Sequence, residues 1–380
     1  MIQALSQEGA TNTILRREQR DLAGEDWRDD NKFVIGAEYG GGMACTAVAG
    51  GLDYLVYTDR IKYIDAHGPM SGAIGAVAAT QSNQMEDLRD IFTWLLAEKR
   101  FIKLSNYLLP GTAANYPYLT SLFRRVLNIE AVYNNPIPLC WPVTRMHGYR
   151  SIIHTKDSVP IDKFVDRVID GTFMPRLGGR RARMDADVRE LDRAEFIKKG
   201  RKLHRRDLKK LGHVADGGLA TISTEDLAVK VAQMYAGDKQ VEILGIAVKP
   251  KRELTPPDEN FTRWVARWVN RQVIDNGKQL VWDAAFAQSQ HLEDLLSGTY
   301  RGASIQVSHP QDIPKLADVI TTDPASLMMS WDAGWNGMCA LFGDTTNMKD
   351  LPERDPRPAK PSLLSMLGGN ALNLAFKLIP

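Results

Sequence analysis

The sequence has no run of about eighteen apolar residues, the length that a membrane-spanning helix needs, so we expect no membrane insertion. Its N-terminus also lacks the cationic start and apolar core of a secretory signal. Cysteine is scarce, since Cys45, Cys140 and Cys339 lie far apart in 380 residues and show no paired spacing. This argues against a disulfide framework or a zinc site and indicates buried or incidental thiols.

Short catalytic motifs are missing as well: the sequence contains no GxxxxGK(S/T), HExxH, CxxC or GxSxG. The seven histidines are scattered, and none has a Cys or carboxylate at a metal-binding spacing. Two glycine-rich stretches are present, GAEYGGG at 36–42 and HGPMSGAIG at 67–75. The first stretch lacks a strongly apolar strand that leads directly into a GxGxxG motif. The second places His67 four residues from Ser71, which is a weak signal of catalysis. We therefore expect a protein that is not an enzyme, with no catalytic residue, metal or cofactor.

What the sequence does contain is a concentration of positive charge in a nearly neutral chain. Residues 176–213 hold fourteen Lys or Arg and six Asp or Glu, a net charge of +8, whereas the whole chain carries +2 and the remainder therefore −6. Five apolar positions in this segment follow helical spacing and predict the inner face of an amphipathic helix that ends near Gly200. These positions are Met184, Val188, Leu191, Ala194 and Ile197.

A folded basic face of this kind can displace counterions from phosphates, which predicts a nucleic-acid-binding surface. The expected donors are Arg180, Arg181, Arg183, Lys198, Lys199, Arg201, Lys202, Arg205, Arg206, Lys209 and Lys210. Two alternatives stay open. The segment is a solvated helix face crossed by ion pairs such as Glu190 with Arg193, or it binds an acidic protein.

A second helical stretch extends the same prediction. In FTRWVARWVNRQ, Arg263, Arg267 and Arg271 recur every four residues and therefore line one stripe of a helix. Arginine rows suit phosphates, and the neighbouring Trp264 and Trp268 either stack on bases or belong to the core.

Composition divides the chain into five parts. These are an N-terminal arm at 1–32, an N-terminal lobe at 33–171, a basic helical element between lobes at 172–215, a C-terminal lobe at 216–343, and a Pro-rich linker with an apolar C-terminal arm at 344–380. The arm at the C-terminus carries large apolar side chains that need burial, either on its own lobe or on a neighbouring copy.

Helical apolar spacing recurs throughout both lobes and predicts a mainly α fold, with two helical lobes and an arm at each end. The expected helices lie at 84–101, 115–129, 223–235 and 256–277, and the inner positions of the third are Leu227, Val231 and Met234. Small residues four apart in 71–80 would let another backbone approach if that stretch is helical. The apolar run 241–248 is either a buried strand or a short core segment.

This layout resembles the nucleoproteins of negative-strand RNA viruses, and NYPYLTSLFRR, with Tyr116, Pro117 and Leu119 ahead of a helix, is similar to an apolar segment of that family. The resemblance implies that single-stranded RNA lies in a cleft between the lobes and that the two arms clasp adjacent copies in a homo-oligomeric helical nucleocapsid. It also implies a location in the virion and host cytoplasm, with the nucleus left open.

We therefore expect a non-enzymatic, self-assembling RNA-binding protein that encapsidates viral RNA through sequence-independent phosphate contacts. One alternative is a shell-forming capsid protein of an RNA virus or phage. The other is a nucleic-acid-acting enzyme without a short motif. The site residues rest on charge, and none is transferred from the family.

Overall fold

The computed structural model describes residues 31–40, 42–82, 89, 92, 101, 114–148, 150–173, 183–200, 211–220, 223–248, 298–311 and 323–344. Contacts divide the chain into one unit at Met1–Asp344 and a second at Thr345–Pro380. Nearly all of both expected arms lies outside the described residues, as do most of the helix expected at 84–101 and all of the one at 256–277.

A five-stranded, mostly parallel sheet organises the described part of the first unit. Its strand order is β2-β1-β7-β9-β8, in which only the edge strand β8 runs antiparallel to its neighbour. The strands are β1 (Lys32–Glu38), β2 (Ala66–His67), β7 (Gln240–Ile246), β8 (Gly298–Tyr300) and β9 (Ala303–Ser308). Ile35 of β1 pairs with Ile243 of β7, which pairs with Ile305 of β9, so aliphatic residues cross the middle of the sheet.

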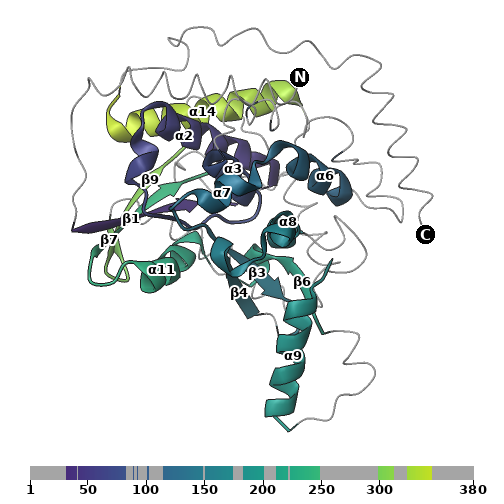
Figure 1. Cartoon of the computed structure of the whole chain (residues 1–380). Helices are drawn as coiled ribbons and strands as arrows, with labels where there is room; N and C mark the ends of the chain where they lie inside the picture. Colours follow the sequence, from purple (N-terminus) through teal and green to yellow (C-terminus); the bar gives the residue numbers. More distant parts are fainter. Residues whose placement is uncertain are drawn as a thin grey trace, which may run out of the picture. The chain divides into compact units, whose positions relative to one another are not determined.

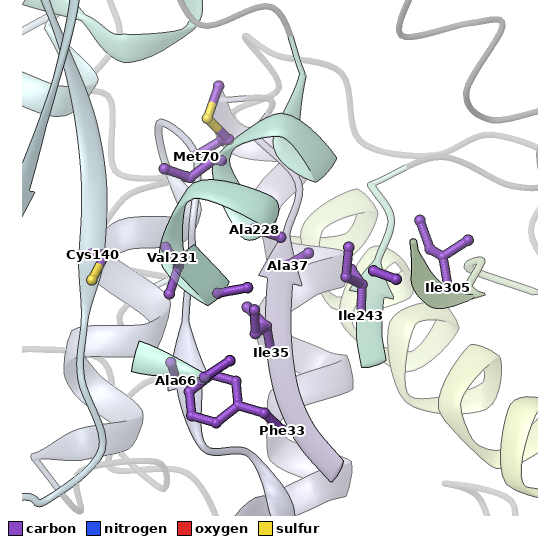
Figure 2. Packing of buried hydrophobic residues seen from close by; sticks show 14 residues of the cluster. Phe33, Ile35, Ala37, Ala66, Met70, Cys140, Ala228, Val231, Ile243 and Ile305 are labelled. Atoms are coloured by element: carbon purple, nitrogen blue, oxygen red, sulfur yellow. The ribbon is translucent and has the colours of Figure 1, made fainter. Parts of the chain in front are cut away.

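Helices cover both faces of this sheet. Figure 1 shows α2 (Thr46–Tyr57) and α14 (Pro324–Phe342) together on one side and α11 (Thr224–Tyr235) on the other. Glycines let α2 and α14 touch, because a Cβ on Gly50 would collide with the Trp331 carbonyl oxygen and a Cβ on Gly334 with that of Ala47. On the opposite face, buried side chains of β1, including Ile35, pack with residues of α11 (Figure 2).

A second sheet is antiparallel, with the order β4-β3-β6-β5. Its strands are β3 (Cys140–Arg145), β4 (Arg150–Thr155), β5 (Arg183–Met184) and β6 (His213–Asp216). A parallel bridge between His67 and Leu139 joins the end of β2 to the residue before β3, so the two sheets meet beside β2. This junction places the end of β6 near the segment that follows β2.

The other helices have local sequence reasons to begin where they do. They are α3 (Ala73–Gln81), α6 (Tyr116–Val126), α7 (Ile129–Asn134), α8 (Phe164–Thr172) and α9 (Ala186–Lys198), with 3-10 turns η1 (Gly42–Cys45), η2 (Arg60–Tyr63), η4 (Lys156–Ser158), η5 (Ile161–Lys163) and η6 (Gly217–Leu219). The side chains of Asn115, Asn128 and Asp185 accept hydrogen bonds from the first turns of α6, α7 and α9. These are the N-cap residues that satisfy otherwise unpaired N–H groups.

The expectation of a mainly α chain with two helical lobes is wrong. The fold is α/β, and β1, from the expected N-terminal lobe, pairs along its whole length with β7, from the expected C-terminal lobe. Short strands such as Ala66–His67 have too few residues to show an alternating pattern, and β7 is an apolar run that periodicity alone does not assign. Parallel pairing between distant segments produces one sheet where composition indicated two separate lobes.

Several helix predictions are confirmed in part. α6 buries Leu119, Leu122 and Phe123, and α11 begins directly after Ser223, the first residue of the predicted range, but Met234, predicted to face inward, is 47% exposed. α9 ends at Lys198, close to the predicted Gly200.

The inner face predicted for α9 is wrong apart from Val188. Leu191 is 53% exposed and Ile197 72% exposed, whereas the buried residues of this helix are Val188, Asp192 and Phe196. The predicted face assumed that apolar residues turn inward, but the buried stripe contains a carboxylate. Asp192 is buried because it accepts hydrogen bonds from Arg145 Nε at 2.8 Å and from the Gly212 N–H at 2.7 Å.

Candidate active site

Ser71 lies in a tight turn between the end of β2 and the start of α3. Its backbone φ is 45°, a left-handed conformation that residues other than glycine seldom adopt. The Met70 N–H donates to the Glu38 carbonyl oxygen at 2.9 Å, and the Ile74 N–H donates to the carbonyl oxygen of Ser71 at 3.2 Å. A strained strand-to-helix turn of this kind presents the nucleophilic serine in many hydrolases.

Asp216 faces Ser71 from the end of β6 on the second sheet. The Ser71 hydroxyl lies 2.7 Å from both carboxylate oxygens of Asp216 and donates to this carboxylate. The Gly218 N–H donates to Asp216 Oδ1 at 2.7 Å, so the turn after β6 holds the carboxylate in place. Asp216 is 6% exposed, whereas Ser71 is partly exposed, so the carboxylate is more shielded from solvent than the serine is.

This environment changes the basicity of the carboxylate. Burial raises the pKa of Asp216 to about 6, while the hydrogen bonds from Ser71 and from the Gly218 N–H act in the opposite direction. A carboxyl group with a pKa near 6 is ionised at neutral pH, yet it is a stronger base than an ordinary aspartate. Ser71 and Asp216 therefore form a nucleophile with an adjacent base, a Ser–Asp dyad.

A glycine-rich loop borders the dyad on the side of β1. A Cβ on Gly40 would lie 2.9 Å from the Cβ of Ser71, and a Cβ on Gly72 would lie 2.8 Å from the carbonyl oxygen of Gly42. Larger side chains at Gly40 and Gly72 would push this loop away from the serine. In the described ranges, the N–H groups of Gly40 and Gly72 donate to no backbone carbonyl.

The turn that carries Asp216 also depends on close packing. A Cβ on Gly217 would collide with the carbonyl oxygen of Pro142 in β3, and the Thr144 hydroxyl donates to the Asp216 carbonyl oxygen at 2.7 Å. The Asp-Gly-Gly sequence thus fits against β3 because its middle residue has no side chain.

His67 does not serve as the base in this arrangement. Its Nδ1 lies 2.6 Å from Glu38 Oε1 in a fully buried pair. His67 is therefore paired with Glu38 and not with Ser71, the neighbour that the sequence weakly indicated. Cys45, Cys140 and Cys339 are buried free thiols, as predicted. Within the described ranges, no cluster of His, Cys, Asp and Glu could hold a metal ion. Of the helices described, none has the length and apolar character to cross a bilayer.

Most of the predicted nucleic-acid donors lie outside the described residues. These are Arg180, Arg181, Arg201, Lys202, Arg205, Arg206, Lys209, Lys210, Arg263, Arg267 and Arg271. Of the described ones, Arg183 donates to Asp170 at 2.5 Å, Lys199 donates to Glu195 at 2.6 Å, and Lys198 is exposed. The structure does not bring these three residues to Ser71.

Hydrogen bonds from Lys199 and Arg145 lower the pKa of Glu195 to about 2, and Glu190 pairs with Arg193 at 2.8 Å, so this part of α9 carries ion pairs of the kind that the alternative describes. RNA binding by the basic element, assembly through the arms, and a viral location stay predictions. Their test is whether nuclease-treated protein binds single-stranded RNA in a salt-dependent manner.

The signals for the dyad were present in the sequence but were not combined. Ser71 precedes the small residues Gly72 and Ala73, and Asp216 stands before two glycines at the end of a short strand. The turn does not match GxSxG, because Pro69 and Ala73 stand at the two glycine positions. The small residues after Ser71 were correctly expected to allow a backbone approach, and Gly72 does so against Gly42.

No family model matches the chain, and no curated protein sequence matches it. Among solved structures, human GIVD cytosolic phospholipase A2 in complex with methyl gamma-linolenyl fluorophosphonate inhibitor and terbium chloride is similar with a TM-score of 0.39 and 11% identity, over 90% of this chain and 64% of that one. VipD from Legionella pneumophila is similar with a TM-score of 0.35 and 9% identity, over 81% of this chain and 67% of that one. The chain thus spans less than two thirds of the phospholipase chain. These likenesses are too slight to assign a function, so the assignment rests on the geometry of Ser71 and Asp216.

That geometry overturns the expectation of a protein that is not an enzyme. A serine with a positive φ whose hydroxyl donates to a shielded carboxylate meets the geometric requirement for an activated nucleophile. The absence of short motifs misled the prediction because the nucleophile and the base come from distant turns.

Proposed function

We propose that the protein is a serine hydrolase that cleaves carboxylic esters through a Ser71–Asp216 dyad. The observation that carries the proposal is the pair of 2.7 Å contacts from the Ser71 hydroxyl to a carboxylate whose pKa burial raises to about 6. The positive φ of Ser71, which Asp59 and Arg301 share, agrees with it, because strained backbone conformations cluster at catalytic sites.

Acylation begins with Asp216 taking the hydroxyl proton as Ser71 Oγ forms a bond to the substrate carbonyl carbon. The carbonyl π electrons move to its oxygen, which becomes an oxyanion. When the intermediate collapses, the bond from carbon to the leaving oxygen breaks and protonated Asp216 gives its proton to the departing alcohol. The oxygen of a water molecule then forms a bond to the acyl carbon as Asp216 takes a proton from that water. Collapse of the second intermediate breaks the bond from this carbon to Ser71 Oγ, which recovers the proton from Asp216 as the carboxylic acid leaves.

The N–H groups of Gly72 and Gly40 would stabilise the oxyanion. Gly72 is the residue directly after the nucleophile, which supplies one donor in hydrolases with a strained serine turn. Gly40 belongs to the loop whose close approach to Ser71 only glycine permits. Fixed donors at a developing negative charge are commonly the largest single contribution to such reactions.

The test is covalent labelling of the purified protein with a fluorophosphonate probe, with mass spectrometry to locate the modified residue. We expect one modification, on Ser71, and hydrolysis of a short-chain p-nitrophenyl ester that the same modification blocks. Ser71→Ala should abolish both. Ser158→Ala is the matched control, because Ser158 is an exposed serine whose hydroxyl only caps a 3-10 turn with Thr155. Labelling that persists in Ser71→Ala, or that falls on another residue, would contradict the proposal.

A further inference from the structure

Glu38 and His67 form a second pair of functional groups, fully buried next to the dyad. Glu38 Oε1 lies 2.6 Å from His67 Nδ1, and the side chains are 0% and 1% exposed. Gly36, which pairs with His67 in the sheet, makes the space for them, because a Cβ there would collide with Glu38 Oε1 and lie 2.9 Å from His67 Nδ1. The contact between Glu38 and His67 therefore depends on glycine at position 36.

The pair contributes less to the stability of the fold than apolar side chains in the same space would. Within the described part of the chain, Glu38 Oε2 and His67 Nε2 are buried and have no hydrogen-bond partner. A buried polar pair that is only half satisfied stabilises a fold less than apolar side chains of similar volume do. Packing alone therefore does not account for Glu38 and His67, and such unsatisfied groups call for a functional explanation.

Both residues stand at the start of a segment that forms the active site. Glu38 is the last residue of β1 and precedes Tyr39 and Gly40 of the glycine loop, while His67 is the last residue of β2 and precedes the Ser71 turn. The Glu38 carbonyl oxygen accepts from the Met70 N–H at 2.9 Å, so Glu38 bonds to β2 through its side chain and to the Ser71 turn through its backbone. The pair thus fastens the two catalytic segments to each other where they leave the sheet.

We propose that Glu38 and His67 are positioning residues for the Ser71 reaction: their side-chain contact fixes the glycine loop relative to the Ser71 turn, and so sets the N–H groups that receive the oxyanion. This inference rests on the proposed serine hydrolase function. Neither side chain touches the reacting atoms. Small displacements of preorganised donors are enough to slow such a reaction, because the donors act on charge that develops only in the transition state.

The experiment replaces the pair by apolar side chains of similar volume, Glu38→Met with His67→Leu, and measures fluorophosphonate labelling of Ser71. We expect the unfolding temperature to stay equal or rise, and the maximal inactivation rate constant to fall about tenfold or more with little change in the probe concentration at half-maximal rate. Ile35→Val is the matched control, since Ile35 is fully buried on the same strand and faces α11. Its labelling rate per folded molecule should match that of the unchanged protein.

An unchanged rate constant in the double variant would overturn the inference, and so would a loss of labelling that only follows a loss of folded protein. If the double variant does not fold, nuclear magnetic resonance on the unchanged protein decides. The ring-nitrogen resonances of His67 should shift when the probe reacts at Ser71, and resonances that stay in place would refute the coupling. Failure of the proposed function is distinct, because the unchanged protein would then show no labelling that depends on Ser71, whatever the state of the pair.

Discussion

Gly40 and Ser71 approach each other so closely that a Cβ on Gly40 would lie 2.9 Å from the Cβ of Ser71 and 3.1 Å from the carbonyl oxygen of Met70. The two residues follow adjacent strands of one sheet, and the register of β1 with β2 brings their segments together. Any side chain at Gly40 must therefore displace either the loop or the serine turn, both of which take part in the proposed chemistry.

Gly40→Ala should lower the inactivation rate constant of Ser71 by about a hundredfold, because a shift of about 1 Å in a catalytic group has effects of this size. Gly68→Ala is the matched control in the neighbouring segment, where an added Cβ would meet nothing closer than 3.6 Å. Fluorophosphonate labelling of the two variants at matched folded concentrations checks this. Equal rates in both would show that the close approach of Gly40 has no catalytic role.

The labelling rate should depend on pH through Asp216. Burial raises the pKa of this carboxyl to about 6, and only its ionised form can accept the Ser71 proton. The rate should therefore fall as the pH is lowered through about 6 and level off above about 7. Asp216→Asn should lower the plateau by about a hundredfold or more and remove this acidic limb. A flat profile from pH 5 to 8 in the unchanged protein would exclude Asp216 as the base.

Ionised Asp216 should also lower the free energy of unfolding of the protein. A folded-state pKa raised from 3.8 to about 6 means that the folded protein binds this proton more tightly than the unfolded chain does. The stabilising effect of the proton is present below the unfolded pKa and is lost as the pH rises through about 6. At pH 8, Asp216→Asn should therefore raise the free energy of unfolding, by up to about 3 kcal/mol. Urea unfolding at pH 8 and pH 4 checks this, since the gain should disappear at the lower pH.

Local structure was more predictable from the sequence than its assembly. The apolar spacing of 115–129 and 223–235 correctly indicated helices, which the structure has at Tyr116–Val126 and Thr224–Tyr235, because such signals act within a few residues. The parallel sheet was not predicted, because pairing of β1 with β7 joins segments about two hundred residues apart and leaves no periodic mark in either.

The candidate site was missed for the same reason. Ser71 and Asp216 are 145 residues apart and come from different sheets, so no single motif contains both. The strain at Ser71 is a property of the backbone, and a serine before a glycine occurs in many turns without it. The charge of 176–213, in contrast, was plain in the sequence, but charge alone does not separate a polyanion site from a helix face with internal ion pairs.

The buried ion pair between Asp192 of α9 and Arg145 of β3 predicts how two substitutions change the free energy of unfolding. Asp192 is 0% exposed and accepts hydrogen bonds from Arg145 and from the Gly212 N–H. Asp192→Ala should cost about 1–3 kcal/mol, because Arg145 Nε and the Gly212 N–H lose their buried acceptor while Arg145 keeps its contact with Glu195. Glu190→Ala is the control on the same helix, since the Glu190–Arg193 pair is largely exposed and should contribute less than about 1 kcal/mol. Equal losses in urea unfolding would mean that Asp192 is not buried as described.

Two adjacent residues of α9 test which face of this helix packs inward. Phe196 is 8% exposed and its ring lies 5.0 Å from the ring of His147, whereas Ile197 is 72% exposed. Phe196→Ala should therefore lower the free energy of unfolding by about 3 kcal/mol, and Ile197→Ala should change it by less than about 0.5 kcal/mol. The apolar spacing of the sequence alone predicts the reverse, because it assigns Ile197 to the inner face. Urea unfolding of the two variants decides between them, and a larger loss at Ile197 would show that α9 packs through the face that the sequence indicated.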